Sequence, residues 1–489
     1  MLALGALAWV VDDAAGLGLL PPVRSLVPGL SANGPVPRSV SETRIAQATT
    51  ALDRMLAARL RPRAETASNR TRTASSASAP GSAAGSADDR ARSVGPIDFD
   101  AAIPPIENPC TDGTDPKCRA RALDRFYAAL RRTALGEPGA VTRITHFGDS
   151  LIVEDLLTST VRRRLQERFG DAGRGFLFVG RPWEWYGRLD VDMRFTDAWH
   201  VARVTIPHIH DDRYGFGGVS FTAVGPGSKA TFSTTGPDKP AAPVSRFDVY
   251  YLEQPGGGSL EVSVDGVVRD TFAMDGPDAR SAFRLVEMPD APHEIAIRSL
   301  GGGPVRLFGV TLEREGPGVV YDAVGILGAS ARALLVPDET HMAEQFAHRH
   351  PDLVVLTFGT NESDGMPGMD GYRDQLREVL RRVRAVAPFA SCLVAGPPDR
   401  GDPATRETRS IIPKIVEAQH EVALAEGCAF WNTFEAMGGK NSMGAWYRMN
   451  PRRSFGDLTH FAPPGGEVVG NLLTGALLRG FVEYLDRAE

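Results

Sequence analysis

Two stretches of alternating strand and helix patterns, separated by a stretch of strand patterns only, constrain the fold more than any other feature. From residue 317 the chain alternates continuous apolar runs such as "DLVVLTFG" with amphipathic runs such as "YRDQLREVLRRVRAVAP". A shorter unit of the same kind covers residues 140–170, where "AVTRITHFGDS" precedes "VEDLLTSTVRRRLQERFG". Continuous apolar strands are typical of a parallel sheet covered by helices on both faces. The sequence therefore predicts one α/β domain that is encoded in two parts.

Residues 189–316 lie between these parts and carry short alternating runs, among them "SRFDVYYLEQ" and "SLEVSVDG", separated by Gly, Pro and Asp. Alternation with a period of two, interrupted by turn residues, is typical of an all-β sandwich. We therefore expect a jelly-roll-like β-sandwich inserted into the α/β domain, whose own two parts are residues 104–188 and 317–489.

The chain before residue 104 divides into two segments. Residues 1–60 combine an apolar start, "MLALGALAWVV", with a helical pattern over 41–60. The apolar run lacks a basic start and is interrupted by Asp12 and Asp13, so it is too short to span a bilayer. We interpret it as a truncated export signal or membrane anchor, with a locally packed helix hairpin as the alternative.

Residues 61–103 are rich in Ala, Ser, Arg and Gly and have few large apolar side chains. Such a segment cannot bury enough surface to offset the entropy of ordering, so we expect a disordered linker. It would hold the folded body away from whatever the N-terminal segment attaches to. Together these segments favour a periplasmic or other extracytoplasmic protein and leave a membrane tether open.

The four cysteines fall into two groups. Cys110 and Cys118 lie in a Pro/Asp/Gly-rich loop, where a short-range disulfide is plausible and would mean an oxidising compartment. Cys392 and Cys428 lie in apolar runs that are typical of buried strands. For these two we expect buried thiols, with a disulfide as the alternative.

Composition excludes some functions. The net charge of −6 argues against nucleic-acid binding, which needs concentrated Lys and Arg. His208 and His210, beside Asp211 and Asp212, resemble metal ligands. A single His-x-His in a β-rich loop, however, more often lies at the surface without binding a metal, so we expect no metal. No zinc spacing and no Walker-type phosphate loop appear, so no cofactor is expected.

Polar residues follow the predicted strands, at the edge where ligands bind in an open parallel sheet. Ser150 follows the first strand, Gly328 the second and Asn361 the third, and Asp457 and His460 lie in a late loop. A serine hydroxyl needs an adjacent base, and that base needs an orienting carboxylate. The oxyanion of an attacked ester needs fixed donors.

The blocks "FGDS", "GILGAS", "GTNE" and "DLTH" resemble, in this order, the four blocks of the SGNH/GDSL hydrolase superfamily. The resemblance implies a flavodoxin-like three-layer αβα domain and a catalytic triad of Ser150, Asp457 and His460. It also implies an oxyanion hole formed by the backbone N–H groups of Ser150 and Gly328 and by the side chain of Asn361. It assigns Asp149 a structural role.

The order of the parts, with a β-rich insert between the first and second blocks, is similar to bacterial peptidoglycan O-acetylesterases of the SGNH type. That resemblance implies an esterase that removes 6-O-acetyl groups from muramic acid, with a carbohydrate-binding-like insert and an acetylated glycan as partner. Trp183, Trp185 and Tyr186 are candidates for stacking on a sugar ring, with packing between the two domains as the alternative.

Two other functions stay open at this point. The same triad serves an O-acetyltransferase when a sugar hydroxyl replaces water. A non-catalytic glycan-binding or assembly protein would keep the fold without using Ser150. The oligomeric state does not follow from the sequence.

Overall fold

The computed structural model describes residues 41–60, 102–111, 118–206, 209–234 and 241–488. The expected signal or anchor in residues 1–40 and most of the expected linker, residues 61–101, lie outside the described residues. Among the described helices, none combines the length and the apolar character needed to cross a bilayer.

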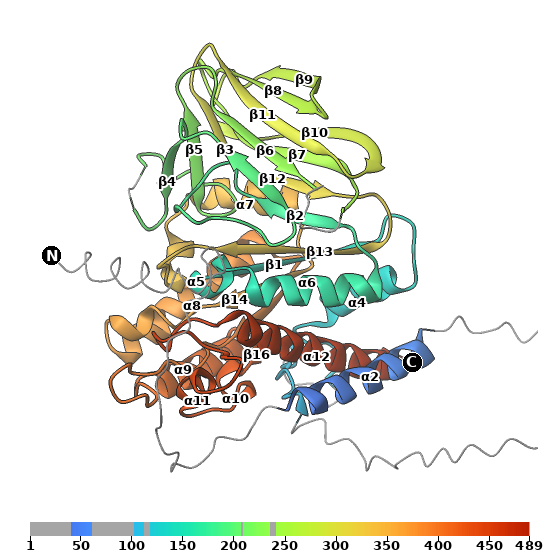
Figure 1. The fold of residues 1–489 in the computed structure, drawn as a ribbon, viewed down its shortest axis with the longest axis vertical. Coiled ribbons are helices and arrows are strands. Elements are labelled where there is room, and N and C mark those ends of the chain that lie inside the picture. The colour runs from blue at the N-terminus through green and yellow to red at the C-terminus, as the bar shows by residue number, and fades with distance from the viewer. Residues whose placement is uncertain (1–40, 61–101, 112–117, 207–208, 235–240, 489) are drawn as a thin grey trace, which may run out of the picture.

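A five-stranded parallel sheet forms the centre of the α/β domain (Figure 1). Its spatial order is the second, first, third, fourth and fifth strand along the chain, which is the flavodoxin-like order predicted from the sequence. The strands, in this spatial order, are β13 (Gly318–Gly325), β1 (Val141–Gly148), β14 (Leu353–Thr357), β15 (Ser391–Ala395) and β16 (Ala429–Trp431). The last strand is shorter than the sequence suggested, because Asn432 caps the short helix α10 (Thr433–Ala436).

Helices cover both faces of this sheet, because its side chains alternate between two apolar cores. In β14, Val355 packs in one core, while Val354 and Leu356 pack in the other. Three helices line the first core: α4 (Asp124–Ala134), α6 (Leu156–Phe169) and α12 (Pro463–Ala488). Three line the second: α7 (Glu339–Arg349), α8 (Met369–Val386) and α9 (Ile412–Ala425).

Two antiparallel sheets form the inserted β domain, as the alternating pattern predicts. One contains β4 (His200–Arg203), β5 (Val219–Ala223), β7 (Val244–Glu253), β10 (Arg280–Ala291) and β12 (Val305–Glu313). The other contains β3 (Asp192–Phe195), β6 (Lys229–Ser233), β8 (Ser259–Val264), β9 (Val267–Ala273) and β11 (Glu294–Gly301). Aromatic side chains of the inserted β domain share one apolar core with helices α7, α8 and α9 of the α/β domain. The two domains therefore pack as one body.

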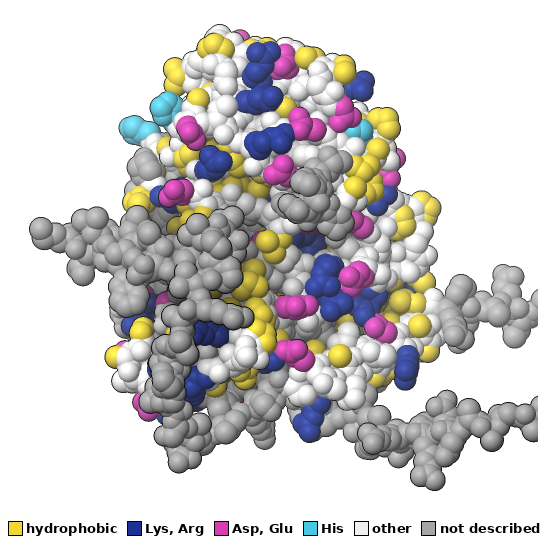
Figure 2. All heavy atoms as spheres, in the orientation of Figure 1, with side chains coloured by type: hydrophobic (Ala, Val, Ile, Leu, Met, Phe, Trp, Pro, Cys, Tyr) yellow, Lys and Arg dark blue, Asp and Glu magenta, His cyan; other side chains and the backbone are white. Residues whose placement is uncertain are grey.

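Strand β2 (Gly173–Leu177) pairs with β12, so the first of these sheets extends upstream of residue 189. On the face shown in Figure 2, Lys and Arg side chains are interspersed with Asp and Glu over both domains. In the β domain, Arg298 of β11 pairs with Glu261 of the neighbouring strand β8, and Arg284 of β10 pairs with Asp270 of β9 in the other sheet.

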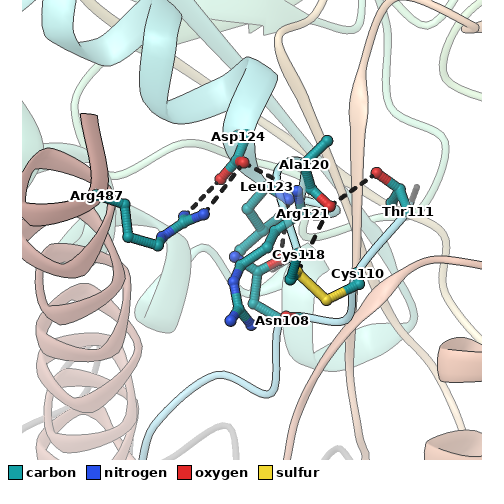
Figure 3. The surroundings of a disulfide bond; sticks show 9 residues. All are labelled: Asn108, Cys110, Thr111, Cys118, Ala120, Arg121, Leu123, Asp124 and Arg487. Atoms are coloured by element: carbon teal, nitrogen blue, oxygen red, sulfur yellow. Dashed lines mark hydrogen bonds and ion pairs between the residues drawn. A yellow bond between two sulfur atoms is a disulfide. The ribbon is translucent and has the colours of Figure 1, made fainter. Parts of the chain in front are cut away.

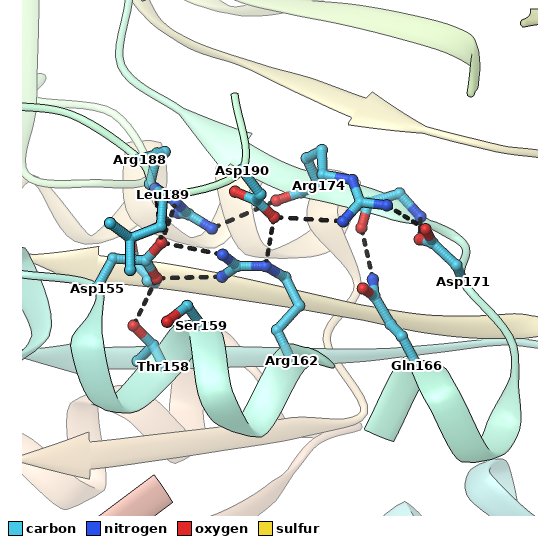
Figure 4. Close-up of polar contacts among 12 residues, drawn as sticks. Asp155, Thr158, Ser159, Arg162, Gln166, Asp171, Arg174, Arg188, Leu189 and Asp190 are labelled. Carbon is cyan, nitrogen blue, oxygen red and sulfur yellow. Dashed lines mark hydrogen bonds and ion pairs between the residues drawn. The ribbon is translucent and has the colours of Figure 1, made fainter. Parts of the chain in front are cut away.

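A buried ion-pair network ties helix α6 to the entrance of the β domain (Figure 4). Arg162 of α6 contacts Asp155 at 2.9 Å and Asp190 at 2.8 Å, and Arg188 contacts Asp155 at 3.2 Å. Arg174 joins the network through Asp190, and its side chain is only 12% exposed. Since the loss of one partner would leave a buried charge, the network fixes the domain junction.

Both pairs of cysteines form disulfides. Cys110–Cys118 closes a loop beside α4, where Asp124 also meets Arg487 of α12 (Figure 3). The expectation of thiols at Cys392 and Cys428 is wrong. These residues come together because Leu393 of β15 and Ala429 of β16 are paired, which brings the preceding cysteines to a Cα–Cα distance of 4.8 Å.

Helix α2 (Glu42–Arg59) packs along α12 (Figure 1). Its buried residues recur at helical spacing, and Arg59 meets Asp486 of α12 at 2.5 Å. The buried face consists of Ile45, Ala48, Leu52 and Leu56. The helix that precedes the expected linker is therefore part of the folded body.

Candidate active site

Ser150 lies on a tight turn between β1 and the one-turn helix α5 (Ser150–Val153). The turn needs Gly148, because a Cβ there would lie 2.3 Å from Ile152 Cγ1 and 2.7 Å from the carbonyl oxygen of Thr357. Asp149 caps α5 by accepting a hydrogen bond from the N–H of Leu151 at 3.0 Å. The strand therefore delivers the serine to the carboxyl edge of the sheet, and α5 aligns it there.

The structure brings Ser150, His460 and Asp457 into one hydrogen-bonded chain. The Ser150 hydroxyl donates to His460 Nε2 at 2.8 Å, and His460 Nδ1 donates to Asp457 Oδ2 at 2.5 Å. The other carboxylate oxygen of Asp457 accepts the backbone N–H groups of Thr459 at 3.0 Å and His460 at 3.1 Å. This geometry matches a nucleophile, a base and an orienting carboxylate.

Charges around His460 make it a stronger base than an ordinary histidine. Burial alone would lower its pKa, but the hydrogen bond to Asp457 and the negative charges of Glu154, Asp457 and Asp149 raise the pKa of His460 to about 9. Burial would raise the pKa of Asp457, and its hydrogen bond to His460 outweighs this and lowers it. The pair therefore favours an imidazolium beside an ionised carboxylate.

The loops after β13 and β14 lie on either side of the serine turn, because these two strands flank β1. Gly328, at φ +72°, shapes the first loop, and a Cβ there would point into open space. Asn361 Nδ2 donates to the carbonyl oxygen of Ala329 at 2.8 Å. An amide nitrogen carries two hydrogens, so this bond orients Asn361 and leaves a second donor.

Two polar residues bind these loops together: Glu362, for which the sequence favours local hydrogen bonding, and Arg400, which the sequence reasoning did not place. Buried Glu362 accepts the N–H of Ala331 at 2.8 Å and the N–H of Gly359 at 2.9 Å, which joins the second and third blocks. Arg400 donates to the carbonyl oxygen of Thr360 at 2.9 Å and to the hydroxyl of Thr459 at 3.3 Å. It thereby joins the loop of Asn361 to the loop of His460.

Glu154 is another residue that the sequence reasoning missed. It follows α5 directly, and its charge acts on His460. The available signal was its spacing of four residues from Ser150 in a segment predicted to be helical.

The three candidate sugar-binding aromatics differ in exposure. Trp183 is 7% exposed and its ring lies 5.7 Å from that of Tyr186, whose hydroxyl accepts the N–H of Phe178. These two side chains pack at the domain junction, which was the alternative stated for them. Trp185 is 46% exposed. Within the described part of the chain, no group of three or more His, Cys, Asp or Glu residues is arranged to hold a metal.

The sequence matches the model of the GDSL-like lipase/acylhydrolase family over residues 292–467. The match includes Gly328, Asn361, Asp457 and His460, and Ser150 lies upstream of it. No curated protein matches the chain.

One solved structure, described as a peptidoglycan O-acetylesterase, is similar in fold. It superposes with a TM-score of 0.62 at 22% identity, covering 73% of this chain and 96% of that chain. A family two carbohydrate esterase from Cellvibrio japonicus aligns at 14% identity with a TM-score of 0.25, covering 60% of this chain and 99% of that chain. Over residues 292–467 the chain is therefore similar in sequence to GDSL-like lipases/acylhydrolases, and its fold is similar to that of a peptidoglycan O-acetylesterase.

Proposed function

We propose that the protein is a serine esterase that removes O-acetyl groups from carbohydrate, with the 6-O-acetyl group of muramic acid in peptidoglycan as its substrate. The observation that carries this proposal is the hydrogen-bonded chain from Ser150 through His460 to Asp457 at the carboxyl edge of the sheet. The match of residues 292–467 to the model of an acylhydrolase family supports the ester chemistry.

In the first half-reaction, His460 Nε2 takes the proton of the Ser150 hydroxyl while Oγ attacks the acetyl carbonyl carbon. The carbonyl oxygen becomes an oxyanion, which the N–H groups of Ser150 and Gly328 and the amide of Asn361 stabilise. His460 then donates the proton to the sugar oxygen, the ester bond breaks, and the sugar alcohol leaves an acetyl group on Ser150. Asp457 stays ionised and stabilises the imidazolium between the two transfers.

In the second half-reaction, His460 takes a proton from water, whose oxygen attacks the acetyl-enzyme. The tetrahedral intermediate breaks down, acetate leaves, and the proton returns to Ser150. These steps balance without any further reactant, because water supplies the oxygen and both hydrogens that end in the acid and the alcohol.

The glycan assignment is supported by fold similarity and by one exposed aromatic. The similar structure with a TM-score of 0.62 is described as a peptidoglycan O-acetylesterase. The segment that contains Trp185 passes the start of α6, because the N–H of Leu189 donates to Asp155 at 3.4 Å. Trp185 is exposed on this segment, and an exposed indole suits stacking on a sugar ring.

We expect Trp185→Ala to raise KM for O-acetylated peptidoglycan by about fivefold, since such contacts are worth about 1 kcal/mol, and to leave hydrolysis of a soluble aryl acetate unchanged. Acetate release from both substrates measures this. Val224→Ala, at an apolar side chain that is 70% exposed on the β domain, is the matched control. Equal KM values for wild type and Trp185→Ala on peptidoglycan would remove Trp185 from the substrate site.

An extracytoplasmic location is part of the proposal. The two disulfides support it, because such bonds persist mainly in oxidising compartments. Peptidoglycan also lies outside the cytoplasm, so this location would bring the enzyme to its substrate.

The experiment that tests the function compares acetate release from O-acetylated peptidoglycan and from acetylated xylan. We expect release from peptidoglycan and little from xylan. No release from either would overturn the esterase proposal, and release from xylan alone would overturn the peptidoglycan assignment. Adding a chitooligosaccharide acceptor separates hydrolysis from transfer, since a transferase would acetylate the acceptor instead of releasing acetate.

A further inference from the structure

Glu154 occupies the position one helical turn after Ser150. Its backbone N–H donates to the carbonyl oxygen of Ser150 at 3.2 Å, as expected for residues four apart in a helix. Residues at this spacing are neighbours on a helix surface, and the hydroxyl of Ser150 lies 2.8 Å from His460 Nε2. The proposed mechanism assigns Glu154 no step.

One oxygen of the Glu154 carboxyl group is buried without a partner, although the residue as a whole is half-buried. This atom, Oε2, is inaccessible to solvent and has no hydrogen-bond partner within the described part of the chain. A buried polar atom of this kind costs folding free energy. A carboxyl oxygen that is kept at such a cost one helical turn from the serine is typical of a functional group rather than of a packing residue.

His460 is surrounded by three carboxyl groups from two parts of the chain. Asp149 and Glu154 flank helix α5, and Asp457 lies in the loop of His460. Glu362 acts on Asp149 from the loop after β14, and Arg400 reaches the neighbouring Thr459 from the loop after β15. The two ring nitrogens of His460 are already bound to Ser150 and Asp457, so Glu154 acts on the ring through its charge.

We propose that Glu154 is a second carboxylate partner of His460, a positioning residue that stabilises the imidazolium formed during catalysis while Asp457 orients the ring. The proposal rests on the proposed esterase function. It assigns the unpartnered oxygen of Glu154 to the imidazolium form of His460, in which the negative charge of Glu154 has a positive partner.

The pH dependence of catalysis follows from this arrangement. His460 acts as a base only when neutral, so kcat/KM of the free enzyme rises as pH increases through the pKa of His460, about 9. Burial raises the pKa of Glu154 to about 8, with His460 acting in the opposite direction, so Glu154 is ionised when His460 becomes neutral. Removing this negative charge destabilises the imidazolium, and the rise in kcat/KM then occurs at lower pH.

The test is the pH profile of kcat/KM for acetate release from a soluble aryl acetate, with wild type, Glu154→Gln and Glu154→Asp. We expect the rise of the Glu154→Gln profile to lie roughly one pH unit lower, because a neighbouring charge of this kind shifts a titration by at least that amount. Its alkaline plateau should be lower, because a weaker base transfers protons less effectively. Glu154→Asp keeps the charge and should rise near the wild-type pH.

Glu167→Gln makes the same change on the exposed face of α6, where the side chain of Glu167 is 52% exposed, and should follow the wild-type profile. A Glu154→Gln profile that rises at the wild-type pH overturns the proposal, whether or not its plateau is lower, because a purely structural residue changes only the plateau. Wild-type protein that releases no acetate from the aryl ester would instead contradict the esterase function itself.

Discussion

Replacement of Ser150 by alanine is expected to lower kcat/KM for acetate release by about 10⁴-fold or more, with little change in substrate binding. The hydroxyl is the only atom that the mechanism attaches to the acetyl group, and the hydrogen bond to His460 Nε2 is lost with it. Residual hydrolysis would come from water activated by His460 beside the oxyanion donors. Measurements of kcat and KM on O-acetylated peptidoglycan and on an aryl acetate give both quantities.

A covalent readout makes this prediction independent of the substrate. Wild-type protein mixed with a reactive acetyl ester and quenched in acid should carry one acetyl group on the peptide that contains Ser150, and Ser150→Ala should carry none. Ser159→Ala, in which the lost hydroxyl donates only to the carbonyl oxygen of Leu156, is the matched control and should retain full activity. Wild-type turnover in the Ser150→Ala protein would exclude Ser150 as the nucleophile.

The arrangement of the α/β domain could be predicted from sequence because a parallel sheet imposes it. Each apolar strand ends at the same edge, so Ser150, Gly328 and Asn361 are brought to one edge whatever the intervening chain contains. The β domain interrupts the chain between the strands of Ser150 and Gly328 without disturbing that edge, because β1 and β13 still pair along their whole length. The order of the motifs was therefore informative despite a long insertion.

Features that depend on strand register or on side-chain direction could not be predicted in the same way. Cys392 and Cys428 were expected as buried thiols because nothing in the sequence showed that the pairing of β15 with β16 brings them together. Nor did the sequence show that Asp171 and Asp190 pair with Arg174 at the domain junction. In both cases the deciding partner lies on another element, at a distance that composition and periodicity do not encode.

The same distinction explains which contacts of the site could not be predicted. Glu362 and Arg400 act by joining loops, and a residue that joins loops has no pattern of its own in the sequence. Glu154 had a local signal, since it lies one helical turn from Ser150. That signal became interpretable only when His460 was seen to contact Ser150.

Asp457→Asn is expected to lower the plateau of kcat/KM by about 10³- to 10⁴-fold without unfolding the loop. The Oδ1 atom of Asp457 accepts the N–H groups of Thr459 and His460, and the carbonyl oxygen of asparagine keeps both bonds. The amide NH₂ then faces His460 Nδ1 and cannot accept its proton. The imidazole therefore adopts the other tautomer, with its proton on Nε2, where it can no longer accept the proton of Ser150.

The pH profile distinguishes this effect from that of Glu154. Asp457→Asn removes the hydrogen bond that raises the pKa of His460, so its residual activity should rise at lower pH than wild type, from a plateau reduced about 10³-fold or more. Glu154→Gln should shift the rise in the same direction with a far smaller loss of plateau, since it leaves the tautomer of His460 intact. Asp370→Asn, at a fully exposed carboxylate on α8, is the control for the change of charge. An Asp457→Asn plateau within about tenfold of wild type would mean that His460 is oriented without Asp457, and the assignment of the triad would then fail at its third member.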